Sequence, residues 1–122
     1  MPAEATMKAA LQSYLDRFNA NDLDGLVALF AEDATVEDPV GSTPNVGKAA
    51  VRTFYAGALQ NGAKLTLSAP IRGSHGNGAA MAFDVKVGPM TVRVIDVMTF
   101  NEAGKITSMK AYFGPSDFIQ GS

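Results

Sequence analysis

The sequence predicts an α+β fold in which three helices precede a run of antiparallel strands. Two observations carry this prediction. Apolar residues recur at spacings of three and four up to about residue 59, and from residue 64 the period changes to two. The 122 residues are enough for one domain with its own core. We therefore expect a single domain over residues 1–122, whose strongly curved, mostly antiparallel sheet wraps around the helices and leaves an apolar cavity between the two layers.

The bulk composition excludes several classes of function. A formal net charge of −2 provides no basic field, so nucleic acid is not expected as a partner. The chain has no cysteine, which excludes disulfides, thiol nucleophiles and iron–sulfur ligation. The single histidine, His75, lies in a glycine-rich loop, where a solvated turn residue is more common than a ligand, so we expect no metal.

Targeting signals are not visible in the sequence. The first six residues contain no basic region followed by an apolar run, so no signal peptide is expected. No later stretch approaches the length of a membrane span. The expected location is therefore the cytoplasm, without insertion into a membrane.

Two helices are predicted in the first 30 residues. Thr6 is a candidate cap for the first, because a threonine side chain can accept a hydrogen bond from the first helical turn. The buried stripe of this helix would consist of Met7, Ala10, Leu11, Tyr14, Leu15 and Phe18. The break at residues 19–22 provides a second cap, and the stripe of the next helix would be Leu23, Leu26, Val27 and Phe30.

A short strand is expected next, over residues 35–38, and Pro39 ends it. Proline has no N–H to give to a sheet, and it holds the preceding residue in extended geometry. Because strand side chains alternate, Asp38 shares a face with Val36. An acid on the face of a valine is either a surface residue before a turn or a base directed into an apolar cleft. We favour the base, and we interpret Glu32 and Asp33 as a helix end or turn.

A third helix is predicted over residues 48–59, after a turn-rich loop at residues 41–45. Its spacing of three and four puts five apolar or aromatic residues on the inner face, namely Val51, Phe54, Tyr55, Ala58 and Leu59. Asn61 and Gly62 are expected to end the helix, because both tolerate left-handed backbone.

Four strands are predicted in the second half of the chain. The first, at residues 64–68, leads to Pro70, which is typical of an edge strand or a bulge. Residues 78–87 show the cleanest alternation, and their inward residues would be Met81, Phe83, Val85 and Val87. Turns rich in glycine then lead into strands over residues 90–100 and 105–113. The tail, residues 114–122, is expected to cover one end of the sheet with Phe118 and Ile119.

Asp96 lies on the more apolar face of the predicted strand over residues 90–100. Its neighbours on that face are Val94 and Met98, and Arg93 points away by parity. An ionised carboxylate buried without a cation is very costly, so such a group takes up a proton. A protonated carboxyl is a hydrogen-bond donor. The alternative is a bulge that shifts the register and exposes Asp96.

Three polar groups are therefore expected to point inward: Tyr14, Asp38 and Asp96. Two would be hydrogen-bond donors and Asp38 an ionised acceptor. A base that removes a proton from carbon, beside donors that hold the developing enolate oxygen, is suited to proton transfer next to a carbonyl. Each residue taken singly also has a structural interpretation, and Tyr14 alone is more often a core tyrosine. Their combination favours catalysis on an apolar substrate.

At these residues the sequence resembles the ketosteroid isomerase (steroid Δ-isomerase) family over almost the whole chain. The most specific match is the run Ala-Thr-Val-Glu-Asp-Pro-Val-Gly-Ser at residues 34–42. Further matches are Ser-Tyr-Leu at 13–15, residues 19–30, residues 50–55, Ile-Asp at 95–96, and residues 104–114.

The resemblance implies the conical nuclear transport factor-like fold, a curved sheet around three helices, and a homodimer packed through the sheet. It implies an enzyme that isomerises Δ5-3-oxosteroids to conjugated Δ4-3-oxosteroids, a small apolar substrate, without a cofactor. Asp38 matches the general base, and Tyr14 and Asp96 match the pair that donates hydrogen bonds to the dienolate oxygen. A carboxylic acid held neutral in an oxyanion hole is an established feature of this family.

The resemblance also suggests supporting residues. Tyr55 matches a tyrosine that supports the first one through hydrogen bonding. Phe83, Met109 and Phe113 fall where apolar residues that line the pocket are expected. Phe30 departs from members that have a further tyrosine there, which would shorten the chain of hydroxyls. Residues 61–88 match the family only in pattern.

Two other classes of function stay open. Another enzyme on the same cone, such as an epoxide hydrolase, dehydratase or polyketide cyclase, would need a different polar set, often additional histidines or an arginine–aspartate pair that handles water. The second class is a non-catalytic binding or dimerisation module, since the same fold serves both catalysis and binding. Such a module has no reason to direct Tyr14, Asp38 and Asp96 inward, and steroid binding without turnover would favour it.

Overall fold

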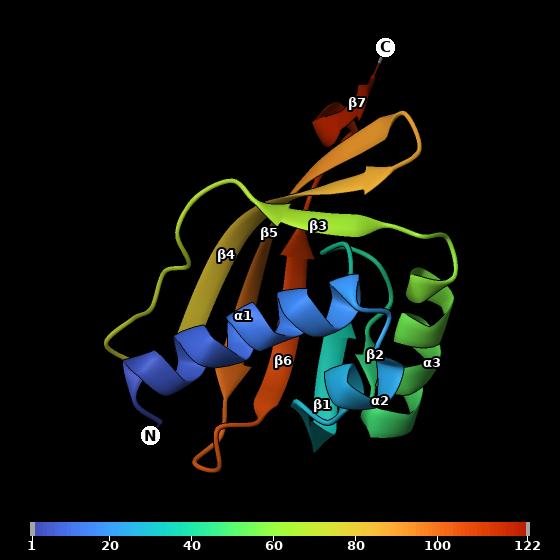
Figure 1. Ribbon diagram of the computed structural model, residues 1–122. Coiled ribbons are helices and arrows are strands. Elements are labelled where there is room, and N and C mark those ends of the chain that lie inside the picture. Colours follow the sequence, from blue (N-terminus) through green and yellow to red (C-terminus); the bar gives the residue numbers. More distant parts are fainter. Residues whose placement is uncertain (1, 122) are drawn as a thin grey trace.

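The computed structural model describes residues 2–121 and confirms the predicted α+β fold (Figure 1). Met1 and Ser122 lie outside the described residues. The helices are α1 (Glu4–Asn19), α2 (Leu23–Val27) and α3 (Lys48–Leu59), with a 3-10 turn, η1, at Pro115–Asp117. The strands are β1 (Phe30–Glu37), β2 (Asn45–Val46), β3 (Lys64–Leu67), β4 (Gly78–Val87), β5 (Met90–Phe100), β6 (Ile106–Tyr112) and β7 (Phe118–Gln120).

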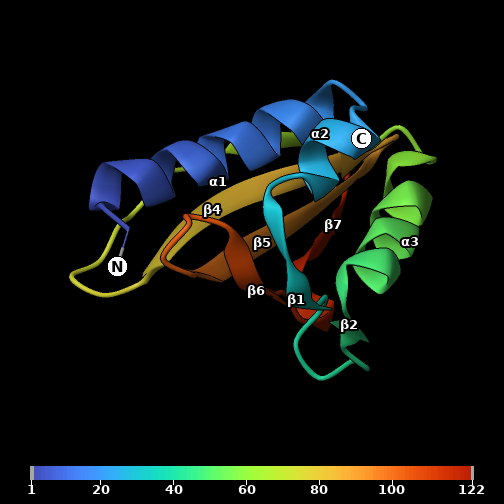
Figure 2. The same ribbon diagram turned by 90° about the horizontal axis from the view of Figure 1, so that it is seen from below.

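One mixed, mostly antiparallel sheet contains the strands in the order β2-β1-β6-β5-β4-β3, and β7 pairs with β5. The pairing of β1 with β6 is parallel. Helix α1 lies across β3 and β4, while α3 packs against β1, β2 and α2 (Figures 1 and 2). The helices and the curved sheet therefore face each other along one side of the sheet, where the core lies. No helix in the described part of the chain is long and apolar enough to span a membrane.

The buried stripe of α1 follows the prediction, but its start does not. Met7, Leu11, Tyr14, Leu15 and Phe18 are buried. The helix begins at Glu4, preceded by an extended Ala3 that provides no side-chain cap, so the prediction that Thr6 caps the helix was wrong. The acidic side chain in the first turn interacts favourably with the helix dipole, which helps the helix to begin earlier.

The second helix is shorter than its apolar pattern predicts. Helix α2 ends at Val27, and Phe30 begins β1, which also contains the residues that we interpreted as a turn, Glu32 and Asp33. Phe30 pairs with Ile106 of β6, and the Ile106 N–H donates to the Leu29 carbonyl at 2.9 Å. Long-range pairing with β6 thus overrides the local helical pattern, although Phe30 stays fully buried, as predicted.

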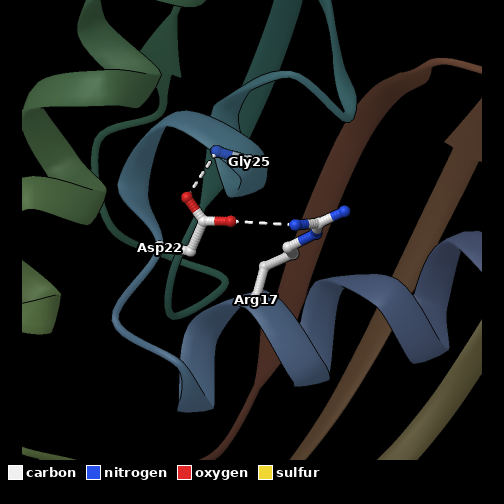
Figure 3. Close-up of polar contacts among 3 residues, drawn as sticks. All are labelled: Arg17, Asp22 and Gly25. Carbon is white, nitrogen blue, oxygen red and sulfur yellow. Dashed lines mark hydrogen bonds and ion pairs between the residues drawn. The ribbon is translucent and has the colours of Figure 1, made fainter.

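The predicted cap before α2 is Asp22 (Figure 3). The Gly25 N–H donates to one carboxylate oxygen at 3.0 Å, and Arg17 donates to the other at 3.0 Å. These contacts, first the backbone hydrogen bond and then Arg17, lower the pKa of Asp22. The turn capped by Asp22 connects α1 to α2, and α2 packs against α3.

The long strands alternate as predicted, whereas the tail does not cover the sheet. On β4, Met81 and Phe83 are buried and Lys86 is exposed. Residues 118–120 instead extend the sheet as β7, in register with β5. Phe118 and Ile119 remain 48% and 42% exposed, so their predicted covering role was wrong. Strand pairing satisfied the tail's backbone hydrogen bonds where sequence patterning suggested only apolar burial.

Candidate active site

A cavity of about 290 Å³ lies between the helices and the inner face of β3, β4 and β5. Its wall is mostly apolar, from side chains such as Phe54, Phe83 and Val94. The polar side chains in this wall are those of Tyr14, Asp38, Tyr55, Asn61 and Asp96. An apolar pocket with a few convergent polar groups is the usual form of a small-molecule site.

Tyr14 and Tyr55 form a buried pair of hydroxyls at this cavity. Their oxygens are 2.8 Å apart, and the rings meet edge to face with centroids at 5.7 Å. Phe30 packs against both rings, at 6.4 Å from Tyr14 and 5.6 Å from Tyr55. Burial is the main cause that raises the pKa of both phenols, so both stay protonated and one hydrogen of the pair can point into the cavity.

Asp96 is almost completely buried, with 1% of its surface exposed. Neither of its carboxyl oxygens has a hydrogen-bond partner within residues 2–121. Burial first, and then the neighbouring Asp38, raise the pKa of Asp96 well above its usual value. It is therefore a neutral carboxylic acid whose O–H is available as a donor. Leaving a buried polar group unpaired is costly, which suggests a ligand that accepts this hydrogen bond.

Asp38 follows directly after β1, on the face of the buried Val36, and lines the same cavity. The structure gives its carboxylate no hydrogen bond or ion pair in the part of the chain that it describes. Partial burial raises the pKa of Asp38 to about 6. Near neutral pH it is thus an ionised carboxylate without a cation, in an apolar wall, which is the environment of an effective base.

The cavity brings together six of the seven side chains that we singled out from the sequence. Tyr14, Asp38, Tyr55, Asp96, Phe83 and Phe113 all line it. Met109 does not: it is buried in the core, where β6 sets it opposite Val36 of β1 and Met98 of β5. The cavity wall does not include Met109, because its neighbours on β1 and β5 enclose it in the core.

Sequence reasoning did not assign much of the cavity wall to a site, and Asn61, Val92 and Phe118 are three such residues. Asn61 was assigned only to the end of α3, yet from the turn just after that helix it lines the cavity beside Ala58. The spacing of three from Ala58 was the available signal. Val92 and Phe118 also line the wall, and Phe118 meets Phe113 edge to face with ring centroids at 5.8 Å. Only the pairing of β7 with β5 brings Phe118 there.

Residues 2–121 contain no group of three or more histidine, cysteine, aspartate or glutamate side chains arranged to hold a metal. His75 is exposed in the loop before β4 and is not part of the cavity wall. The polar groups that the described chain provides at the cavity are two carboxyl groups, two phenols and the Asn61 amide.

Comparison with known proteins shows the family to which the chain belongs. Residues 11–109 match the SnoaL-like domain. A steroid Delta-isomerase of Nocardioides simplex is 40% identical over 119 residues, which cover 94% of this chain and 95% of that protein. The epoxide hydrolase LasB of Streptomyces lasalocidi is 33% identical over 96% of this chain, which spans only 44% of the length of LasB.

A solved structure agrees in fold. The epoxide hydrolase/cyclase-like enzyme SalBIII, described in pyran ring formation in the polyether salinomycin, superimposes with a TM-score of 0.90 at 28% identity. The match covers 98% of this chain and 99% of SalBIII. The chain thus belongs to the SnoaL-like domain family and is a homologue of steroid Delta-isomerase.

Proposed function

We propose that this protein is a steroid Δ-isomerase that converts Δ5-3-oxosteroids into conjugated Δ4-3-oxosteroids. The observation that carries the proposal is the carboxyl of Asp96, which is buried and unpaired in the described chain. It lies close enough to Tyr14 to raise the pKa of that phenol, and it faces a cavity that also contains Asp38. Donors and base thus surround one apolar space, as proton transfer beside a carbonyl requires.

In the proposed reaction the steroid 3-oxo oxygen accepts hydrogen bonds from Tyr14 and from protonated Asp96. The Asp38 carboxylate removes a proton from C4, and the electron pair moves through C3 onto the oxygen to form a dienolate. Asp38 then returns the proton to C6, so that the double bond moves into conjugation with the ketone. The reaction is internally balanced and needs no electron acceptor, hydride donor or water.

Tyr55 is proposed as a positioning residue. Its hydroxyl lies 2.8 Å from that of Tyr14, and if it donates there, the hydrogen of Tyr14 is left for the steroid oxygen. Phe30, which packs against both rings, offers no further hydroxyl to this chain. Preorganised donors of this kind each contribute roughly a hundred- to a thousandfold in rate.

The test of this function is ultraviolet absorbance after the purified protein is mixed with a Δ5-3-oxosteroid. Conjugation of the enone creates a strong new absorption band, so no label or coupling enzyme is needed. Growth of that band far above the rate in buffer is expected. Bound steroid without growth of the band would contradict the proposal and favour a binding protein.

The rate should depend on pH through Asp38. Because burial raises the pKa of Asp38 to about 6, kcat/KM is expected to rise about tenfold per pH unit below that value and to level off above it. Asp96 and Tyr14 must stay protonated, and the pKa of each is raised, so the plateau should extend to alkaline pH. Initial rates at low substrate concentration measure this profile. A rate that does not change between pH 5 and pH 7 would exclude Asp38 as the base.

A second candidate function is epoxide opening, which the similarity to LasB and SalBIII favours. A neutral acid such as Asp96 can protonate an epoxide oxygen while a carboxylate such as Asp38 activates an attacking hydroxyl. The cavity wall contains no arginine and no histidine in the described chain to orient water, and we therefore prefer isomerisation. The substrate distinguishes the two. Growth of the enone band from a Δ5-3-oxosteroid favours isomerisation. Loss of the epoxide from an epoxide substrate favours the second function, with the mass of water added if water attacks and with unchanged mass if an internal hydroxyl closes a ring.

We also propose that the protein is a homodimer that packs through the outer face of the sheet. Ile95 and Tyr112 are cross-strand partners on β5 and β6, and each is 48% exposed, with Val97 38% exposed beside them. Contiguous exposed apolar side chains are typical of interaction surfaces. Sedimentation should give twice the chain mass of 12.7 kDa, and Ile95→Glu should halve it.

The control for the dimer is Val46→Glu. Val46 is 68% exposed on β2, at the far edge of the sheet, and its substitution should leave the dimer intact. A single-chain mass for the unmodified protein, or an Ile95→Glu variant that sediments as a dimer, would contradict this interface.

A further inference from the structure

The cavity has two chemically different ends. The buried end contains Tyr14, Tyr55 and Asp96, which are 3%, 1% and 1% exposed. The other end opens to solvent beside Asn61 and Phe118, which are both exposed. Asn61 is the polar side chain of the cavity wall that the proposed chemistry does not use.

The wall formed by α3 connects these two ends. Phe54 and Ala58 lie on one face of α3 at a spacing of four, and Asn61 lies in the turn just after the helix ends at Leu59 and lines the same cavity. Tyr55, whose hydroxyl meets Tyr14, is six residues before Asn61. At a rise of 1.5 Å per residue, the four residues from Tyr55 to the helix end at Leu59 correspond to about 6 Å along the helix axis, and Asn61 lies beyond that end.

The wall formed by the sheet runs in the same direction. Val92, Val94 and Asp96 alternate along β5 and line the cavity, with Phe83, Val85 and Val87 on the paired strand β4. From Asp96 to Val92 is about 13 Å along an extended strand. A flat apolar ligand that is anchored by its oxygen at Asp96 therefore extends toward the β4–β5 turn and the open end, where Asn61 lies.

Asn61 has a free donor at this end. Its Oδ1 accepts a hydrogen bond from the Ala63 N–H at 3.2 Å, which fixes the side-chain oxygen to its own turn. The Nδ2 group makes no hydrogen bond within the described residues, and an amide nitrogen offers two donors. The side chain is thus held by one atom while the other is available to a ligand.

We propose that Asn61 determines steroid specificity by donating a hydrogen bond from its amide to a ketone on ring D, at C17. This inference rests on the proposed function, because it takes the C3 oxygen to bind at Tyr14 and Asp96. The apolar wall between the two ends contacts the ring system only through its shape. The C17 oxygen is therefore the group by which the site distinguishes steroids with otherwise similar rings.

The experiment compares three phenolic steroids that share ring A and differ only at C17. Estrone has a ketone there, estradiol has a hydroxyl, and 17-deoxyestrone has neither. Titration calorimetry measures the dissociation constant of each. The unmodified protein is expected to bind estrone roughly three- to tenfold more tightly than 17-deoxyestrone, as one exposed hydrogen bond allows.

The matched variant is Asn61→Asp, which retains an oxygen for the Ala63 N–H but has no donor. It should lose the preference for estrone over 17-deoxyestrone. Estradiol can donate its hydroxyl to the new carboxylate, so the variant should prefer estradiol to estrone. In the isomerase assay, the ratio of kcat/KM between 17-oxo and 17-deoxy Δ5-3-oxosteroids should fall by the same factor.

Equal affinities of the unmodified protein for estrone and 17-deoxyestrone would overturn the proposal without any variant. So would a preference for estrone that survives in Asn61→Asp. Turnover of the 17-deoxy substrate distinguishes a failure of the role proposed for Asn61 from a failure of the proposed isomerase function. If the protein isomerises that substrate but shows no preference at C17, only the role of Asn61 fails. If no phenol binds and no substrate isomerises, the proposed function fails as well.

Discussion

Replacement of Asp38 by asparagine is expected to reduce kcat by about a hundred- to ten-thousandfold while steroid binding persists. Asparagine has nearly the shape of aspartate, so the apolar wall beside Val36 keeps its form. It cannot accept a proton from carbon, however, and the proposed reaction has no other ionised acceptor at the cavity. Growth of the enone band measures the rate, and a phenolic steroid titration measures the binding.

Stability should not explain this loss of rate. Burial raises the pKa of Asp38 to about 6, so the folded state binds this proton more tightly than the unfolded chain does. The protonated carboxyl therefore adds stability that is fully present below pH 3.8, the ordinary pKa of the group, and is lost as the pH rises from there through about 6. The neutral asparagine avoids that loss, and Asp38→Asn should be at least as stable as the unmodified protein at pH 7.

The matched control is Asp33→Asn, an exposed carboxylate on the same strand, β1. It changes the net charge by the same amount and is expected to retain full activity. Unchanged turnover in Asp38→Asn would remove Asp38 as the base. Equal losses in both variants would point to a general electrostatic effect instead.

Asp96→Leu is expected to lower kcat by about a hundred- to a thousandfold through loss of one donor to the dienolate oxygen. The same substitution should not weaken the fold, because it replaces an unpaired buried carboxyl by an apolar side chain of similar size. The enone assay and thermal unfolding measure the two effects on one sample. A lower kcat together with a higher unfolding temperature would identify Asp96 as a residue that is retained for function.

Asp96→Asn provides the graded control. Its amide still donates a hydrogen bond, but it is a weaker acid than a carboxyl, so its rate should lie between those of the unmodified protein and of Asp96→Leu. If Asp96→Leu instead lost stability while its folded fraction turned over normally, Asp96 would be a structural residue and the oxyanion hole would consist of Tyr14 alone.

Local patterns were sufficient for much of the fold. The stripe of α1 and the alternation of β4 and β5 were predicted because a helix and a strand each repeat their buried face at a fixed period. The same parity predicted that Asp96 points inward among valine and methionine side chains, and it lies buried there. Tyr14 was recognised for the same reason. Periodicity is a property of neighbouring residues, so it can be read without knowledge of the partner strand.

Contacts between distant segments decided what the pattern could not. Phe30 entered β1 because β6 was available to pair with it, and β7 joined β5 although the tail resembled an apolar cover. Met109 was assigned to the core and Asn61 to the mouth of the cavity by the positions of their elements in the sheet and helix layers. The sequence determined which side chains face inward; which of them share one cavity depended on strand order and curvature, which arise only when the whole chain packs.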